Sequence, residues 1–531
     1  MKAELANRLW LASSRRSSIR FHDAAKDVAG TQLQLLRYYL ARNRDTQYVS
    51  EHYPDLPLST YDDYLPYIER IANGEKNILT VDPVLMFELS SGSTSASKLI
   101  PYTRTLKNEF QRGLSSWIRD LYSHHPGLIS GPAYWSISPI LDGPGHTPAG
   151  IPIGFEEDSE YLGPLGFLIG SALAVPNMVK HIHDMTAFRY VTLLFLLRCS
   201  ALRLISVWNP TFLTLLLEPL SEWWDPLLRD LSLGSVTPPK PIEGSLLHQL
   251  SKKLKPDPNR AKRLSSSKPN DYSSIWPHLE LISCWADGIS KSYSDELQAN
   301  FPNVTIQPKG LLATEAFVSF PLVNSDGTAL AVTSHYFEFQ TETGDIFPAH
   351  HLYKGKTYSV IVTTGGGLYR YQLNDMIEVT GFYGQVPCFK FVGKTDQVSD
   401  YFGEKLNEHF VTNILHQSFE KHQLSPAFYM LAPEDAGGFH YTLYIEAPAL
   451  PANLASELDS ALRANFHYDY CRRLGQIGEI QIDLVKHGSE AYMRACLMRG
   501  QKLGNIKTSI LQKSLGWKNH FSDNEVKRQF P

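Results

Sequence analysis

Residues 87–98 read Phe-Glu-Leu-Ser-Ser-Gly-Ser-Thr-Ser-Ala-Ser-Lys, and this stretch decides the fold that we expect. The apolar run Pro83 to Phe87 that leads into it is typical of a short strand. The loop after the strand can wrap a polyphosphate closely, because its backbone N–H groups and small hydroxyls donate to phosphate oxygens and Lys98 adds a positive charge. It lacks the G-x-x-x-x-G-K-S/T spacing of a Walker loop. A serine-rich loop alone is more often an ordinary loop, so other segments must decide between the two interpretations.

A second segment, Leu-Leu-Ala-Thr-Glu at residues 311–315, carries groups that suit a nucleotide site. The carboxylate of Glu315 can ligate Mg²⁺, and the hydroxyl of Thr314, next to Ala313, can donate to a phosphate. A lone Thr-Glu pair means little. The Thr314-Glu315 pair is informative only because it lies between the serine-rich loop and the segments that follow.

A third segment, residues 334–339, reads Ser-His-Tyr-Phe-Glu-Phe and predicts a strand. Alternation along the strand places Tyr336 and Glu338 on one face and two phenylalanines on the other. An aromatic ring on a nucleotide-facing strand can stack on adenine. The alternative is a pair of structural aromatics in a sheet.

A fourth segment, residues 363–375, combines a glycine-rich turn with Tyr-Arg-Tyr and ends at Asp375. We expect Leu368 to Tyr371 to form a strand that leads to this aspartate. A carboxylate can accept hydrogen bonds from both hydroxyls of a ribose, so the residue type fits that task. Asn374 precedes it, and asparagine tolerates left-handed backbone conformations. The alternative is a plain hairpin with a surface aspartate.

Two further segments carry charged residues that suit a mobile catalytic domain. Residues 393–400, Gly-Lys-Thr-Asp-Gln-Val-Ser-Asp, separate the long strands from a region of short strands and helices and predict a hinge. Residues 499–507 contain Lys502 and Lys507, and a lysine brought onto an α-phosphate would stabilise developing charge there. We favour Lys507 over Lys502, with ordinary solvated lysines as the alternative.

Taken in order, these segments resemble the Gretchen Hagen acyl acid amido synthetases (the auxin-responsive promoter family), which are adenylate-forming enzymes. The phosphate loop of that superfamily has the layout of the serine-rich loop, and its members also carry a Thr-Glu pair, an aspartate after Tyr-Arg and a hinge. The marks of the narrower family include Tyr336-Phe337-Glu338-Phe339 and Gly367 to Tyr371. With Phe402-Gly403-Glu404-Lys405 at the hinge, the sequence resembles the shorter microbial members more than the plant members. Lys394 stands where the superfamily commonly has arginine, which keeps the charge but loses the bidentate geometry. Asn374 stands where the superfamily usually has glycine.

The resemblance implies an α/β fold with two domains. A large N-terminal domain, residues 1–393, would hold β-sheets covered by helices and bind the nucleotide and the acyl acid. Residues 394–400 would form the hinge, and residues 401–531 a small mobile C-terminal α+β domain.

The resemblance also implies a two-step reaction that uses ATP and Mg²⁺. A carboxylate attacks the α-phosphate of ATP to give an acyl-adenylate and pyrophosphate, and an amine, commonly that of an amino acid, then displaces AMP. The implied catalytic residues are Lys98, Lys405 and Lys507. The implied nucleotide-binding residues are Ser90, Ser91, Gly92, Ser93, Thr94, Ala313, Thr314, Glu315, Tyr336, Asp375 and Lys394, with Glu315 also binding the metal.

The acid pocket is less well defined by the sequence. Trp135, Val207 and Trp208 are apolar or aromatic residues near the middle of the large domain and could line an acyl pocket. Packing in the core is the competing interpretation for all three.

Composition excludes several classes of protein. The net charge of −4, from 50 basic and 54 acidic residues, gives no reason to propose a nucleic-acid or membrane partner. The five cysteines are widely spaced, which favours a reducing compartment, and we expect a cytoplasmic monomer. Residues 251–272 are basic and rich in Ser, Pro and Asn, which predicts a solvated loop.

Two other functions fit the same residues. One is an acyl-adenylating ligase whose acceptor is a thiol or a hydroxyl. The other is a catalytically degenerate protein that binds a nucleotide or a small acid, which the departures at Asn374 and Lys394 would allow.

Overall fold

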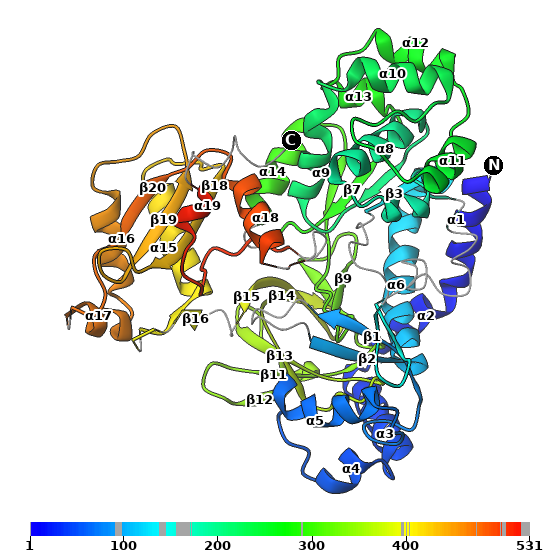
Figure 1. Cartoon of the computed structure of the whole chain (residues 1–531). Coiled ribbons are helices and arrows are strands. Elements are labelled where there is room, and N and C mark those ends of the chain that lie inside the picture. Colours follow the sequence, from blue (N-terminus) through cyan, green and yellow to red (C-terminus); the bar gives the residue numbers. More distant parts are fainter. Residues whose placement is uncertain are drawn as a thin grey trace. The chain divides into compact units, whose positions relative to one another are not determined.

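The chain divides into two compact units in a computed structural model of the protein (Figure 1). The first unit comprises residues 1–373 and 377–391, and the second comprises residues 374–376 and 392–531. The structure describes residues 2–90, 98–136, 145–154, 170, 172–287, 290–394, 398–399, 401–402, 404–473, 475–499, 501 and 506–521. Most of the expected hinge therefore lies outside the described residues, and the hinge remains a prediction.

The helices α1 to α6 lie in the N-terminal part of the first unit. Each of α3, α5 and α6 begins at a side chain that satisfies a free backbone N–H group: the Asp27 carboxylate accepts from Gly30, the Asp63 carboxylate accepts from Thr60, and the Thr103 hydroxyl accepts from Leu106. The helices are α1 (Lys2–Ser13), α2 (Arg15–Ala24), α3 (Val28–Asn43), α4 (Gln47–His52), α5 (Tyr61–Ala72) and α6 (Arg104–His124).

The serine-rich loop joins the two strands of an antiparallel hairpin. Strand β1 (Val84–Ser90) pairs with β2 (Lys98–Thr103), and Ser90 opposite Lys98 is the last pair before the loop. Two short strands, β4 (Gly145–His146) and β5 (Pro152–Ile153), complete a sheet in the order β2-β1-β5-β4. The expected strand at Pro83 to Phe87 is thus present, while residues 91–97 lie outside the described part of the chain.

A second sheet is parallel throughout. Its order is β3 (Ala133–Trp135), β6 (Leu204–Ser206), β7 (Leu281–Cys284) and β8 (Thr305–Pro308). Strands β6 and β7 are fully buried, as expected for a sheet that helices cover. The covering helices gather together in Figure 1 and are α8 (Met185–Arg198), α9 (Pro210–Leu217), α10 (Trp224–Leu233), α11 (Gly244–Lys253), α12 (Pro258–Ser265), α13 (Tyr272–Ile275) and α14 (Ser290–Asn300).

The expectation of a solvated loop over residues 251–272 is wrong. Helix α12 lies inside this range, with Asp257 as its N-cap and Pro258 at its first position, both of which favour a helix start. Arg260 is buried and donates hydrogen bonds to the carbonyl oxygens of Leu197 and Ile275. Those carbonyls lie at the ends of α8 and α13, so a basic residue has a packing role that composition does not reveal.

The third sheet of the first unit has seven strands in the order β12-β11-β13-β14-β15-β10-β9. The expected strand at Leu368 to Tyr371 is wrong in its bounds, because Gly367 and Arg370 adopt left-handed conformations (φ 94° and 47°) that delay the strand until Tyr371. The strands are β9 (Ser319–Pro321), β10 (Thr328–Leu330), β11 (Tyr336–Gln340), β12 (Ile346–Pro348), β13 (Thr357–Thr363), β14 (Tyr371–Tyr383) and β15 (Val386–Lys394).

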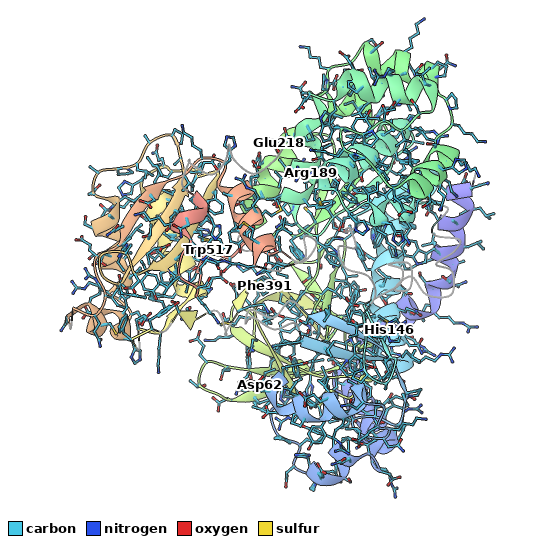
Figure 2. The ribbon with its side chains drawn as sticks, viewed as in Figure 1. Asp62, His146, Arg189, Glu218, Phe391 and Trp517 are labelled. Carbon is cyan, nitrogen blue, oxygen red and sulfur yellow. The ribbon has the colours of Figure 1, made fainter. Side chains whose placement is uncertain are left out.

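The second unit is an α+β arrangement. Strands β18 (Phe428–Glu434) and β19 (His440–Glu446) are antiparallel, and β20 (Gln481–Leu484) pairs with β19 in parallel. Trp517, labelled in Figure 2, stacks on Tyr492 with ring centroids 5.3 Å apart and fixes the C-terminal segment to this core. The remaining elements are β16 (Val398–Ser399), β17 (Leu406–Asn407), α15 (Glu408–Lys421), α16 (Leu454–Leu462), α17 (Phe466–Arg473), α18 (Gly488–Met498) and α19 (Lys518–Phe521).

Four 3₁₀ helices complete the described elements: η1 (Pro126–Ser130), η3 (Asn177–His181), η4 (Glu218–Leu220) and η5 (Ala349–His351). Among the described residues, no helix combines the length and the apolar character needed to cross a bilayer. The five cysteines are free thiols.

A buried carboxylate ties three parts of the first unit together. Oε1 of Glu109 in α6 accepts a hydrogen bond from the Tyr39 hydroxyl (2.8 Å), and Oε2 accepts one from the Gly365 N–H (2.9 Å). The Nδ1 of His335 lies 3.0 Å from the same Oε2. The Nε2 of His335 accepts from the Phe317 N–H at 3.0 Å, so in the neutral ring Nδ1 carries the proton. Glu109 and His335 are fully buried.

We predict that Glu109→Ala lowers the free energy of unfolding of the first unit by about 3–5 kcal/mol, because it leaves several buried donors without an acceptor. Urea unfolding followed by tryptophan fluorescence measures this, since every tryptophan except Trp517 lies in the first unit. The control is Glu4→Ala, which removes a surface ion pair with Arg8 and should cost less than about 1 kcal/mol. Equal effects of the two substitutions would contradict the role given to Glu109.

Candidate active site

The Thr-Glu segment forms the tip of a tight turn in the first unit. The Ala313 N–H donates to the Ala316 carbonyl at 3.0 Å, which leaves Thr314 and Glu315 at the tip. Two phenols, from strands of two different sheets, hold this tip. The Tyr102 hydroxyl of β2 donates to the Thr314 carbonyl at 2.6 Å, and the Tyr371 hydroxyl of β14 donates to Glu315 Oε1 at 3.3 Å.

Tyr61 of α5 connects this turn with the base of the serine-rich loop. The Lys98 ammonium lies 5.3 Å from the centroid of the Tyr61 ring, and the Tyr61 hydroxyl accepts from the Leu99 N–H at 2.8 Å. Burial raises the pKa of Tyr61, and the charge of Glu315 adds to the rise. Lys98 therefore lies against this phenol, and the hydrogen bond from Tyr102 to Thr314 links the same hairpin to the Thr-Glu turn. The structure brings together the hairpin and the Thr-Glu turn, while Ser91, Gly92, Ser93 and Thr94 lie outside the described residues.

Strand β11 presents Tyr336 and Glu338 on one half-buried face, as alternation predicts, with Phe337 buried on the other. Burial raises the pKa of Tyr336 to about 12, so the ring carries no charge at neutral pH. Glu338 forms a two-pronged ion pair with Arg370, at 2.9 and 3.1 Å. A carboxylate and a guanidinium in this geometry fix each other's orientation, and they fix the strand next to Tyr336.

The described residues include no group of three His, Cys, Asp or Glu side chains that could hold a metal ion. Glu315 is nearly buried, with 7% exposure, and offers a single carboxylate at the turn. Mg²⁺ commonly binds through one or two carboxylates together with substrate phosphates and water. The residues present therefore fit a metal that arrives with a nucleotide and do not form an all-protein cage.

The predicted acid-pocket residues lie at the carboxyl end of the parallel sheet. Trp135 is the last residue of β3, and Trp208 follows β6 with 36% exposure. Val207, in contrast, is fully buried in the apolar core among the covering helices. A residue that sequence reasoning missed, Lys309, follows β8. Its ammonium lies 5.1 Å from the Trp208 ring centroid and 5.9 Å from that of Trp135.

Asp375 and Lys394, both assigned to nucleotide binding, form an ion pair within the second unit. Lys394 Nζ lies 3.2 Å from Asp375 Oδ1, and Asp375 has 4% exposure. Asn374 adopts φ 62°, the left-handed conformation that asparagine accepts more readily than other non-glycine residues. The exchange of glycine for asparagine at this point is therefore compatible with the backbone.

Lys405 lies on a turn that a buried carboxylate organises. Glu404 accepts from the backbone N–H groups of Tyr401 (3.0 Å) and Phe402 (2.8 Å) and from the Tyr441 hydroxyl (2.5 Å). Lys405 follows with φ 45° and is exposed. Such a conformation is unfavourable for lysine and persists because Glu404 fixes the residues before it.

Lys507 is exposed on the C-terminal segment of the second unit. The Tyr492 hydroxyl donates to the Lys507 carbonyl at 2.9 Å. Glu408, at the start of α15, accepts from the Ser509 hydroxyl and the Ile510 N–H at 2.5 and 2.7 Å, and burial raises its pKa. These bonds anchor both sides of Lys507, whereas Lys502 lies outside the described residues.

We predict that Lys309→Met raises the melting temperature at pH 7 and that the gain shrinks towards pH 10. Burial lowers the pKa of Lys309 to about 7, against about 10.4 in an unfolded chain. Below about pH 7 both states bind the proton, and the desolvated ammonium destabilises the fold most. Between about pH 7 and about pH 10.4 the folded state releases the proton, and this destabilisation becomes smaller.

Thermal unfolding from pH 6 to pH 10 measures this difference. The matched control is Lys262→Met, which removes an exposed lysine of α12 and should leave the melting temperature nearly unchanged at every pH. A gain at Lys309 that does not vary with pH would contradict the lowered pKa.

Comparison with known proteins identifies the family. Models of the GH3 family N-terminal, central and C-terminal domains match residues 18–306, 328–394 and 409–515 in that order. Indole-3-acetic acid-amido synthetase GH3.3 of Arabidopsis thaliana is 24% identical over 92% of this chain and 90% of its own length. GH3.8 of Oryza sativa subsp. indica, also named an indole-3-acetic acid-amido synthetase, is 24% identical over 92% of this chain and 89% of its own length.

A solved structure with the same fold supports this. AtGH3.15 acyl acid amido synthetase, in complex with 2,4-DB, superposes with a TM-score of 0.83 at 21% identity and covers 96% of both chains. The two-domain α/β fold predicted from the sequence is confirmed by this likeness. Because the first family model alone covers more than half of the sequence and the other two follow in order, the chain belongs to the GH3 family.

Proposed function

We propose that the protein is an ATP-dependent acyl acid amido synthetase. It adenylates a carboxylic acid with release of pyrophosphate and then transfers the acyl group to the amine of an amino acid. The observation that carries this proposal is the ordered match to all three GH3 domain models, together with relatives named amido synthetases over nine-tenths of the chain. The position of Lys98 against Tyr61, and the hydrogen bonds from Tyr102 to Thr314 and from Tyr371 to Glu315, support it.

The first step forms a bond between a carboxylate oxygen and the α-phosphorus of ATP and breaks the anhydride bond to the β-phosphate. Negative charge grows on the phosphate oxygens as this happens, and fixed donors and cations offset it best. In the first unit, Ser90, Lys98 and Thr314 fill this role, and Tyr336 contacts the adenine. When bound, Mg²⁺ at Glu315 would supply positive charge to the leaving pyrophosphate.

The second unit contributes the remaining charged groups. Asp375 accepts hydrogen bonds from the ribose, with Lys394 beside it, and Lys507 stabilises the α-phosphate during adenylation. In the second step the amine nitrogen attacks the acyl carbon, AMP leaves with its oxygen, and the nitrogen loses a proton. Lys405 serves the phosphate region, and the hinge at residues 394–400 allows the two steps to use different arrangements of the unit.

The test of this function is pyrophosphate release from ATP and Mg²⁺ with a panel of aromatic and aliphatic acids, each with and without pooled amino acids. We expect release that requires one acid class and turns over repeatedly only when an amine is present. Repeated turnover with coenzyme A and no amine would point instead to a thiol acceptor. No release with any acid, from protein that binds ATP, would favour a nucleotide- or acid-binding protein.

We predict that Lys507→Ala slows adenylation at least tenfold and slows amide formation from a supplied acyl-adenylate much less. The reason is that Lys507 offsets charge at the α-phosphate, which develops in the first step. Lys518→Ala removes an exposed lysine of the same unit and is the control, expected to change neither step. An equal loss in both half-reactions of Lys507→Ala would contradict this role.

A further inference from the structure

Lys309 occupies a cage of indole rings without an anionic partner in the described part of the chain. Its ammonium lies 5.1 Å from the ring centroids of Trp117 and Trp208 and 5.9 Å from that of Trp135. It donates one hydrogen bond, to the Ser206 hydroxyl at 2.8 Å, and forms no ion pair with a described carboxylate. Ring faces stabilise the charge but accept few of the remaining hydrogen bonds of the ammonium.

The cage lies where α/β folds commonly bind small ligands. Trp135, Ser206 and Lys309 stand at or directly after the carboxyl ends of three strands of the parallel sheet. The crevice outside the carboxyl ends of such strands is the usual ligand site. Trp208, with 36% exposure, and the partly exposed Trp135 and Lys309 show that the core does not seal the cage.

Helix α6 sets the position of the cage relative to the Thr-Glu turn. A Cβ atom at Gly113 would lie 2.3 Å from the ring of Phe317, so the chain just after Glu315 packs against α6 at this level. Trp117, which faces Lys309, is four residues further along, or about 6 Å along the helix axis. The cage therefore lies about 6 Å further along α6 than the Thr-Glu turn.

We infer that Lys309 and its three tryptophans bind the end of the acid that is remote from the reacting carboxylate, and that they select flat acids with a second oxygen acceptor there, best a second carboxylate. This inference rests on the proposed function, because it takes the reacting carboxylate to lie near the Thr-Glu turn. The exposed parts of Trp135 and Trp208 pack on the flat body of the acid, and the ammonium donates to the second acceptor. An apolar end would instead bury an ammonium with unmet donors, which is unfavourable.

The test is titration calorimetry at pH 7 with benzene-1,4-dicarboxylate, 4-hydroxybenzoate and 4-methylbenzoate, with pyrophosphate release measured for the same acids. We expect wild-type protein to bind the dicarboxylate at least tenfold more tightly than the methyl compound, with 4-hydroxybenzoate between them. In Lys309→Met, which keeps the length of the side chain without its charge, this preference should disappear or reverse. Lys262→Met should keep the wild-type preference.

The two readouts separate the inference from the proposed function. Preferential binding of the dicarboxylate that Lys309→Met abolishes, without pyrophosphate release from any acid, would support the cage and contradict the synthetase. Pyrophosphate release with no preference among the three acids, or with a preference that Lys309→Met leaves intact, would overturn the inference about the cage. The proposed synthetase function would stand. If Lys309→Met weakened the binding of all three acids equally, the inference would also be overturned. Such a result would show that Lys309 acts on a feature common to every acid.

Discussion

The buried carboxylate of Glu109 is the constraint on which the first unit depends. Its two oxygens meet the Tyr39 hydroxyl of α3, the Gly365 N–H and the His335 ring, none of which can reach water. A buried charge of this kind destabilises a fold unless hydrogen bonds surround it, and here they come from segments far apart in the sequence. The carboxylate therefore holds those segments in one relative position.

Each of these segments leads directly to a candidate site residue. His335 precedes Tyr336 on β11, and its Nε2 accepts from Phe317, two residues after Glu315. Gly365 begins the turn that ends at Arg370, the partner of Glu338. One charged group thus fixes the aromatic strand, the Thr-Glu turn and the glycine-rich turn together. The second unit repeats the device on a smaller scale, since Glu404 fixes the turn before Lys405 and Glu408 anchors the segment around Lys507.

The parts of the structure that the sequence predicts well are those that local pattern determines. The strand before the serine-rich loop, the two faces of β11 and the left-handed Asn374 all follow from residue type and alternation. Patterns fail where a distant contact decides the outcome. Arg260 makes α12 part of the core by binding two carbonyls from other helices, and the cage of Lys309 draws its rings from α6, β3 and the chain after β6. Local periodicity in the sequence does not predict such contacts between distant segments. The roles of the site residues remain predictions for the same reason, since they concern bound nucleotide and acid.

The central claim is that a carboxylate oxygen of the acid becomes bonded to the α-phosphorus of ATP before the amide forms. The most direct measurement uses an acid that supports turnover, with ¹⁸O in both carboxylate oxygens, together with ATP, Mg²⁺ and an amino acid. Mass spectrometry of the products should find one labelled oxygen in AMP and the other in the amide. Labelled oxygen in inorganic phosphate, accompanied by ADP, would show an acyl phosphate route and contradict the account.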